Sequence, residues 1–282
     1  MGQVDLQIFF SQTQNGPGKV ILNLTKGLDL CKINYELNQA PKDGINKICL
    51  SEHSILKTHF IKELYIGPNI CTLPIDSKIV MEAKYKKYLV NSKWTYSAYK
   101  KWLPDNKLDM WAVGVDTDLF SNFSEEKKTN DCLIYFKRRN LEDLIFATKM
   151  LKKLNQSLEI IEYGNYNEEH FLNSIKKSKY AFVIDNCESQ GIAIQEMMSS
   201  NLPLFVWDVE FWDDRGEEYK VPASSVPYWD NRCGLKIFYK NEIFDKFYFF
   251  INNLNLYSPR DYILEEFQLD KKALEIIEKL NR

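Results

Sequence analysis

The chain has 282 residues, of which 45% are hydrophobic and 27% are charged, and its formal net charge is −2. This length allows two domains of ordinary size, and the composition is typical of a soluble globular protein rather than a disordered one. The small net charge makes a nucleic-acid partner unlikely, and no segment approaches the roughly 20 apolar residues of a membrane-spanning helix. The six cysteines are scattered without a close pair, so we expect reduced thiols, no zinc site and a cytoplasmic location.

The amino-terminal part of the chain predicts an α/β domain. Residues 4–10 form an apolar run of strand length, Gly16-Pro17-Gly18 predicts a tight turn, and apolar residues recur at helical spacing from Val20 onward. Such a turn can bring Gly16 and Gly18 close to a ligand, or it can be only a turn. More strands of a parallel sheet are predicted by the short apolar runs at residues 33–37, 45–50, 64–66 and 88–90.

Three polar residues follow these strands closely. His53 and its neighbour Glu52 come after the run at 45–50, and Asn69 comes after the run at 64–66. Ligands of open α/β sheets bind beyond the carboxyl ends of the strands, so these residues are candidates for a site. A surface histidine and a turn-capping asparagine are the plainer interpretations.

Lysines and aromatic residues alternate between Lys84 and Trp102. This combination suits a membrane surface, an anionic acceptor or single-stranded nucleic acid. A solvated helix face with aromatic anchors is the plainer interpretation, so peripheral membrane contact is one hypothesis for this segment.

A second α/β domain is predicted to begin with a strand at residues 131–136. Lys137, Arg138 and Arg139 follow it directly. Cations at a strand end suit a pyrophosphate, because charge-assisted hydrogen bonds are among the stronger polar interactions. A helix at 141–154 and a strand at 158–163 complete this part of the pattern.

The stretch from Tyr180 to Trp207 predicts a strand, a polar turn, a helix and a second strand. Glu188 stands where the first strand passes into the helix, and Glu196 falls about two helical turns later. Gly191 lets the backbone approach a ligand, and the helix start offers N–H groups to an anion. One site can therefore hold hydroxyls and phosphate together, although an ordinary strand–helix–strand crossover also has this pattern. Beyond it we expect a loop at 208–234, a strand at 236–239, a helix at 242–254 and a terminal helix from 261.

The run ESQGIAIQE, residues 188–196, resembles the donor-site motif of retaining GT-B glycosyltransferases of family 4, also called group 1 glycosyltransferases. The match falls on Glu188, Gly191, Ile192 and Glu196. Two further runs are similar to that family, NGPGKV at its first glycine-rich loop and GVDTDLF, residues 114–120, at its interdomain linker.

This resemblance implies an α/β protein of two Rossmann-like parallel-sheet domains that face a central cleft. Residues 1–118 would form the acceptor-side domain, and residues 119–282 would form the donor-binding domain, with a terminal helix that crosses back. The implied activity is transfer of a sugar, with retained configuration, from a nucleotide-diphosphate-sugar to a glycan, lipid-linked or other small acceptor. Neither a metal nor a cofactor is expected.

The resemblance also implies roles for individual residues. Glu196 would hold the ribose hydroxyls and Glu188 the sugar hydroxyls, while Tyr163 and Tyr166 would lie toward the nucleotide base. The implied catalytic residues are His53, Lys137 and Glu188. The implied donor-binding residues are Gly16, Gly18, Lys137, Arg138, Arg139, Tyr163, Glu188, Ser189, Gly191, Ile192 and Glu196.

Other functions stay open at this point. A non-catalytic nucleotide-sugar or glycan-binding protein, or a nucleotide-sugar epimerase, would fit the same fold, and glycosylation of DNA is disfavoured by the charge. The triplet Asp116-Thr117-Asp118 has the composition of a divalent-cation ligand, but it coincides with the linker match, so we expect it to be structural.

Overall fold

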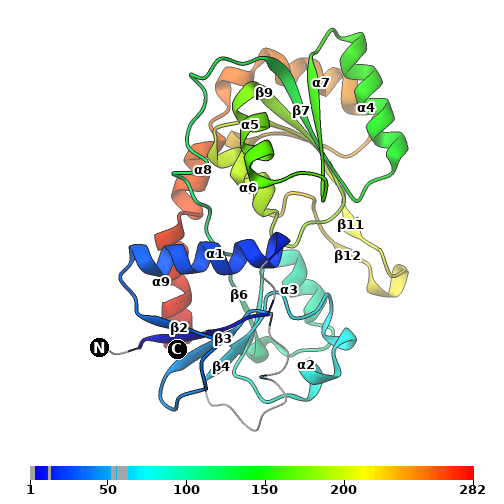
Figure 1. Ribbon diagram of the computed structural model, residues 1–282. Helices are drawn as coiled ribbons and strands as arrows, with labels where there is room; N and C mark the ends of the chain where they lie inside the picture. Colours follow the sequence, from blue (N-terminus) through cyan, green and yellow to red (C-terminus); the bar gives the residue numbers. More distant parts are fainter. Residues whose placement is uncertain (1–3, 12–13, 52–54, 56–62) are drawn as a thin grey trace. The chain divides into compact units, whose positions relative to one another are not determined.

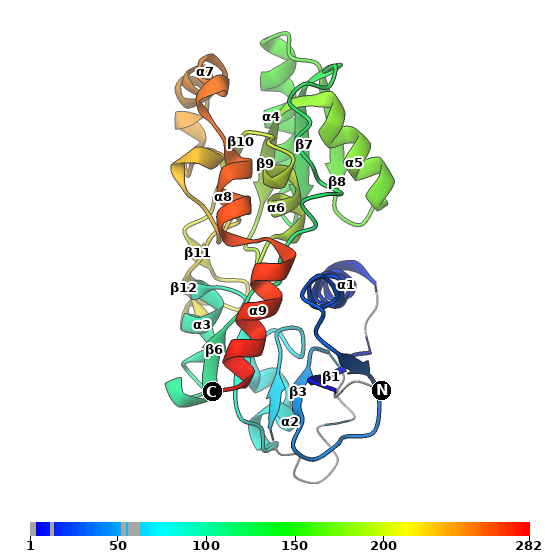
Figure 2. The ribbon, with the colours of Figure 1, turned by 90° about the vertical axis from the view of Figure 1, so that its left-hand side faces the viewer.

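The computed structural model describes residues 4–11, 14–51, 55 and 63–282. The chain forms two compact units: unit 1 comprises Met1–Gly114 and Phe267–Arg282, and unit 2 comprises Val115–Glu266. Each unit is a parallel sheet with flanking helices (Figures 1 and 2), so the predicted pair of Rossmann-like domains is confirmed. The division falls after Gly114 rather than after residue 118, and the last helix belongs to unit 1.

Unit 1 contains a six-stranded sheet in the order β2-β1-β3-β4-β5-β6, with every neighbouring pair parallel. Strands β1 to β5 lie in the segments where short apolar runs predict them, because strands that are covered on both faces are rich in apolar residues. Strand β6 was not predicted from such a run. Their bounds are β1 (Leu6–Phe9), β2 (Tyr35–Leu37), β3 (Asn46–Cys49), β4 (Leu64–Ile66), β5 (Tyr88–Val90) and β6 (Leu108–Met110).

The helices of unit 1 are α1 (Asn15–Leu30), α2 (Lys78–Glu82), α3 (Lys93–Tyr99) and α9 (Leu269–Leu280). The predicted turn at Gly16-Pro17-Gly18 is instead the first turn of α1, where the missing N–H of proline costs nothing. Helices α1 and α9 pack closely, since a Cβ on Gly27 would lie 2.4 Å from the carbonyl oxygen of Leu269.

Unit 2 contains a five-stranded parallel sheet in the order β13-β10-β9-β7-β8. Its strands are β7 (Asn130–Lys137), β8 (Leu158–Glu162), β9 (Ser178–Asp185), β10 (Leu204–Trp207) and β13 (Gly234–Ile237). Strands β7 and β9 are in register from Asn130 opposite Ser178 to Lys137 opposite Asp185. Both strands therefore end at the same edge of the sheet.

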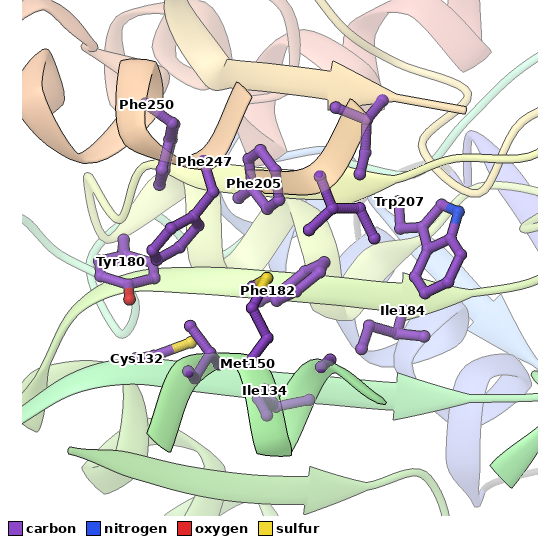
Figure 3. Close-up of a cluster of buried hydrophobic side chains, with 14 of the residues drawn as sticks. Cys132, Ile134, Met150, Tyr180, Phe182, Ile184, Phe205, Trp207, Phe247 and Phe250 are labelled. Atoms are coloured by element: carbon purple, nitrogen blue, oxygen red, sulfur yellow. The ribbon is translucent and has the colours of Figure 1, made fainter. Parts of the chain in front are cut away.

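The helices of unit 2 are α4 (Leu141–Lys153), α5 (Glu168–Lys177), α6 (Ile192–Ser199), α7 (Ile243–Asn252) and α8 (Pro259–Glu266). Apolar residues of α4 and α7 cover one face of the sheet (Figure 3). There the ring of Phe205 makes edge contacts with Phe182 and Phe247, with centroids 5.0 and 5.4 Å away. Tyr135, on the other face, packs against Phe171 of α5 at 6.0 Å.

Two features differ from the sequence prediction. The segment predicted as a loop contains a small antiparallel hairpin of β11 (Phe211–Trp212) and β12 (Val221–Pro222), whose strands are too short to show a hydrophobic period. The predicted terminal helix is broken into α8 and α9, because Gln268 adopts an extended conformation and caps α9. None of the described helices is long and apolar enough to cross a membrane.

Candidate functional site

Polar residues gather at the carboxyl edge of the unit 2 sheet. Lys137 is the last residue of β7 and Asp185 the last residue of β9, and the two are register partners. Tyr163 directly follows β8, and Asp208 directly follows β10. Each of these four neighbouring strands therefore has a polar residue at its carboxyl end, at the edge of the sheet where ligands of open α/β sheets bind.

Lys137 and Glu188 form a buried ion pair at this edge. Nζ of Lys137 contacts Oε1 of Glu188, and the two side chains are only 8% and 11% exposed. The same ammonium lies 4.1 Å from the ring centroid of Tyr163, within range of a cation–π interaction. A cation and a carboxylate are thus held together where β7 ends and the turn after β9 passes.

The two arginines after Lys137 have different surroundings. Nη1 of Arg139 donates to the carbonyl oxygens of Asp185 and Trp207, at 3.2 and 3.4 Å, and its Nε donates to Asp143. Arg139 therefore joins the ends of β9 and β10 to α4. Arg138 is exposed, has a left-handed backbone with φ 51°, and makes no hydrogen bond or ion pair with any residue in the described part of the chain.

The turn after Glu188 presents the start of α6. Gly191 is the N-cap of this helix and has φ 78°, a conformation that favours glycine. Its carbonyl oxygen accepts the first hydrogen bond of the helix, from the N–H of Gln195. The N–H groups of Ile192 and Ala193 precede that bond, so they suit an anion at the helix start. Ser189 is exposed in the same turn.

Glu196 and Glu188 both act on Tyr166, which follows β8. Burial, together with the charges of Glu196 and Glu188, raises the pKa of Tyr166 to about 12. Glu196 is 2% exposed, and the ring of Tyr166 packs on Phe171 with centroids 5.1 Å apart. The charges of both glutamates of the motif thus affect one tyrosine, and the ring of that tyrosine packs on a core residue.

Asp208 organises a buried network that reaches the backbone of Glu188. Its carboxylate accepts hydrogen bonds from the N–H of Ser225 and the hydroxyl of Ser224, each at 2.7 Å, and pairs with Nζ of Lys236 at 3.0 Å. The carbonyl oxygen of Ser224 accepts the N–H of Glu188 at 3.2 Å. Asp208 thus fixes the segment that holds Glu188.

The β11–β12 hairpin holds the residues just before Glu188. Asn186 donates to Oδ1 of Asp214 at 3.1 Å, while Trp212 donates to Oδ2 of the same carboxylate at 3.0 Å. The thiol of Cys187 contacts the carbonyl oxygen of Phe211 at 3.5 Å. The hairpin and the Asp208 network together fix the turn that carries Glu188.

The other predicted residues belong to unit 1 or fall outside the described residues. Gly16 and Gly18 are in the first turn of α1 in unit 1, and His53 and Glu52 fall outside the described residues. Ser92 is the N-cap of α3. Nδ2 of Asn69 is buried without a hydrogen-bond partner among the described residues.

The segment from Lys84 to Trp102 does not present its aromatic residues to solvent as a group. Tyr85, Tyr88 and Tyr99 are buried in the core of unit 1, because Tyr88 is the first residue of β5 and Tyr99 packs on it at 4.9 Å between ring centroids. These three side chains are therefore not available to contact a membrane surface.

The Asp116-Thr117-Asp118 triplet forms a structural turn. Oδ1 of Asp116 accepts the N–H of Leu119, and the carbonyl oxygen of Thr117 accepts Nη2 of Arg260. In the part of the chain that the structure describes, no group of three or more His, Cys, Asp or Glu side chains is arranged to hold a metal ion.

The sequence prediction missed Asp185, Asp208, Ser224 and Lys236. Asp185 and Asp208 are each the first polar residue after a buried apolar run, which is the pattern that singled out Lys137. That signal could have found the two aspartates. The contact of Ser224 with Glu188 depends on the path of the hairpin segment, which has no local pattern.

Protein-family models and curated proteins give no match to this chain. Solved structures do: sucrose-phosphate synthase from Thermosynechococcus elongatus matches with a TM-score of 0.68 at 10% identity, over 98% of each chain. AviGT4, a glycosyltransferase involved in avilamycin A biosynthesis, gives 0.65 at 10% identity, over 99% of this chain and 98% of its own. The catalytic domain of starch synthase IV from Arabidopsis thaliana, bound to ADP and acarbose, gives 0.64 at 9% identity, over 100% and 99%.

These structures are GT-B glycosyltransferases. The chain has the GT-B fold. The agreement covers nearly the whole chain, and the low identity means that it is an agreement of fold. Within this GT-B chain, Lys137, Glu188, Gly191 and Glu196 all belong to the second Rossmann-like unit.

Proposed function

We propose that this chain is a glycosyltransferase that takes a sugar from a nucleotide-diphosphate-sugar held by unit 2 and transfers it, with retention, to a glycan, lipid-linked or other small acceptor. This proposal is based on one structural observation. The buried Lys137–Glu188 pair stands at the carboxyl edge of the sheet, in the same turn region as the α6 helix start.

The parts of this edge match the parts of such a donor. Lys137, the exposed Arg138 and the N–H groups of Ile192 and Ala193 suit the two phosphates, because cations and helix N-termini both favour anions. The carboxylate of Glu188 suits sugar hydroxyls, and that of Glu196 suits ribose hydroxyls. The exposed Ser189 is a further hydrogen-bonding candidate.

Lys137 has the central role in the proposed reaction. Negative charge grows on the diphosphate as the bond to the sugar breaks, and a fixed cation at that place lowers the barrier. We propose that this chain's own cations serve that purpose without a metal or a cofactor. The ADP bound to starch synthase IV, a protein of the same fold, supports a nucleoside diphosphate as the leaving group.

The test is a panel of UDP-, GDP- and ADP-sugars with sugar acceptors, in which release of the nucleoside diphosphate is measured with and without a chelator. We expect one nucleotide to give turnover, and we expect Lys137→Ala and Glu188→Ala to lower it at least tenfold. Lys220→Ala is the matched control, because Lys220 pairs with an exposed glutamate in the hairpin.

Two other outcomes would contradict parts of this proposal. Nucleotide binding without turnover on any acceptor would favour a non-catalytic nucleotide-sugar-binding protein. Loss of turnover in the chelator would contradict the metal-independent part of the proposal.

A further inference from the structure

Asp185 is a buried acidic residue, and only one of its two carboxyl oxygens has a hydrogen-bond partner among the described residues. It ends β9 directly opposite Lys137, and its exposed fraction is 0%. Oδ1 accepts the N–H of Asn186 at 2.7 Å, whereas Oδ2 is buried and has no hydrogen-bond partner among the described residues. A buried carboxylate oxygen without a donor is costly, so this atom needs an explanation.

The charges around Asp185 do not balance if it is ionised. Asp185 and Glu188 are both buried, and Lys137 is the cation that the described contacts place against them. Nη1 of Arg139 donates a hydrogen bond to the backbone carbonyl oxygen of Asp185 and not to its carboxylate. Two buried carboxylates beside one ammonium group would leave a net charge of −1 in a medium of low dielectric constant.

Burial and the charge of Glu188 also favour the protonated form of Asp185. Burial and then repulsion from Glu188 raise the pKa of Asp185 well above its ordinary value, while the charge of Lys137 opposes them. The other titratable groups that face it are Tyr135 and Cys187, and the negative charge of Asp185 contributes to the raised pKa of each. Neither supplies a positive charge.

We propose that Asp185 carries a proton in the folded protein and donates it from Oδ2 to the carboxylate of Glu188. Two carboxyl groups can share a hydrogen bond only when one of them is protonated, and this proton gives Oδ2 the partner that it otherwise lacks. The cluster of Lys137, Glu188 and Asp185 is then neutral. Asp185 is a positioning residue, because it acts on Glu188 and Lys137.

One consequence rests on the proposed function. A neutral cluster can accept a diphosphate, whereas ionised Asp185 would add a negative charge beside Lys137 and repel it. Affinity for a nucleoside diphosphate should therefore fall as the pH rises through the pKa of Asp185. Asp185→Asn keeps a hydrogen-bond donor and stays neutral, so its affinity should not fall in that range.

Infrared difference spectroscopy tests the proton directly. At neutral pH, the difference between wild type and Asp185→Asn should contain the C=O band of a protonated carboxyl group, shifted in D2O. Asp230→Asn is the control and should show no such difference band, because the hydrogen bonds from Arg232 hold the pKa of Asp230 below its ordinary value. If Asp185→Asn does not fold, Glu188→Gln should shift the same band by changing its hydrogen-bond acceptor.

The proton is not on Asp185 if wild type lacks the C=O band of a protonated carboxyl group, or if that band is unchanged in Asp185→Asn and Glu188→Gln. Titration with UDP, GDP and ADP over a range of pH separates the two proposals. A band without binding of any nucleotide supports the proton on Asp185 and contradicts the proposed function. Binding without a band contradicts the proton and leaves the proposed function standing.

Discussion

The ammonium group of Lys137 and the carboxylate of Glu188 form an ion pair whose side chains are 8% and 11% exposed. Glu188 stands in the turn after β9, so this pair links the ends of β7 and β9. A buried pair depends on both partners, because removal of one leaves a charge without compensation.

We therefore expect Lys137→Met to lower the free energy of unfolding by about 3–5 kcal/mol. The double variant Lys137→Met/Glu188→Gln should recover most of that loss, since no buried charge remains. Urea denaturation measures both. Lys220→Met, which breaks an exposed pair, should cost at most about 1 kcal/mol. A double variant no more stable than Lys137→Met would show that the loss does not come from an uncompensated charge on Glu188.

The hydrogen bond from Glu188 to Ser224 predicts that Asp208 affects the site at a distance. Asp208→Asn should lose about 1–3 kcal/mol of stability and also weaken nucleotide binding, because the segment that holds Glu188 is released. Ser224→Ala removes the hydroxyl but keeps the carbonyl oxygen that Glu188 uses. It should cost stability and leave binding nearly unchanged. Calorimetry and urea denaturation separate the two effects.

Much of the fold was predictable because several of its strands, β7 and β9 among them, are apolar runs that end in polar residues. The run YAFVI before Asp185 and the run before Lys137 fixed two adjacent strands and the edge at which they end. The resemblance then gave a role to Glu188 and Glu196. The hairpin and the break before α9 were missed because two-residue strands and Gln268 carry no local signal.

The site was less predictable than the fold. Nothing in the sequence distinguishes Arg138 from Arg139, and only the structure shows that Arg139 is hydrogen-bonded to two strand ends. The pairing of Lys137 with Glu188 depends on tertiary structure in the same way. The roles predicted for His53, Gly16 and Gly18 stay predictions.

The two arginines should respond differently to substitution. Arg139→Ala should lower the free energy of unfolding by roughly 1–3 kcal/mol, because it leaves the carbonyl oxygens of Asp185 and Trp207 without this donor. Arg138→Ala should leave stability within about 0.5 kcal/mol and weaken nucleoside diphosphate binding. Thermal unfolding and titration calorimetry provide the comparison. Unchanged binding in Arg138→Ala would exclude it as a phosphate ligand.

Glycine substitutions test the helix start. Gly191→Ala should destabilise the protein by about 1–2 kcal/mol through its positive φ, although a Cβ there would meet no atom closer than 3.6 Å. Gly16→Ala should be neutral or stabilising by up to about 1 kcal/mol, since it lies in the first turn of α1 with open space around it. Binding that falls in Gly16→Ala without a loss of stability would support a ligand role for Gly16.

The raised pKa of Asp185 predicts a pH dependence of stability. Its unfolded pKa is about 3.9, so between that value and the higher folded pKa the folded state binds more protons than the unfolded state. The free energy of unfolding should then fall as pH rises through this window, by at most about 1.4 kcal/mol per pH unit. Asp185→Asn should lack this contribution. If the free energies of unfolding of wild type and Asp185→Asn, measured by urea denaturation, changed with pH in the same way, this prediction would be wrong.

A calorimetric titration of wild type and Lys137→Ala with UDP, GDP and ADP tests whether Lys137 helps unit 2 to bind a nucleoside diphosphate. Wild type should bind at least one of these nucleotides, and Lys137→Ala should bind it at least tenfold more weakly while remaining folded. Binding of no nucleoside diphosphate by wild type, or equal binding by a folded Lys137→Ala, would contradict the placement of a nucleotide-sugar at this edge of unit 2.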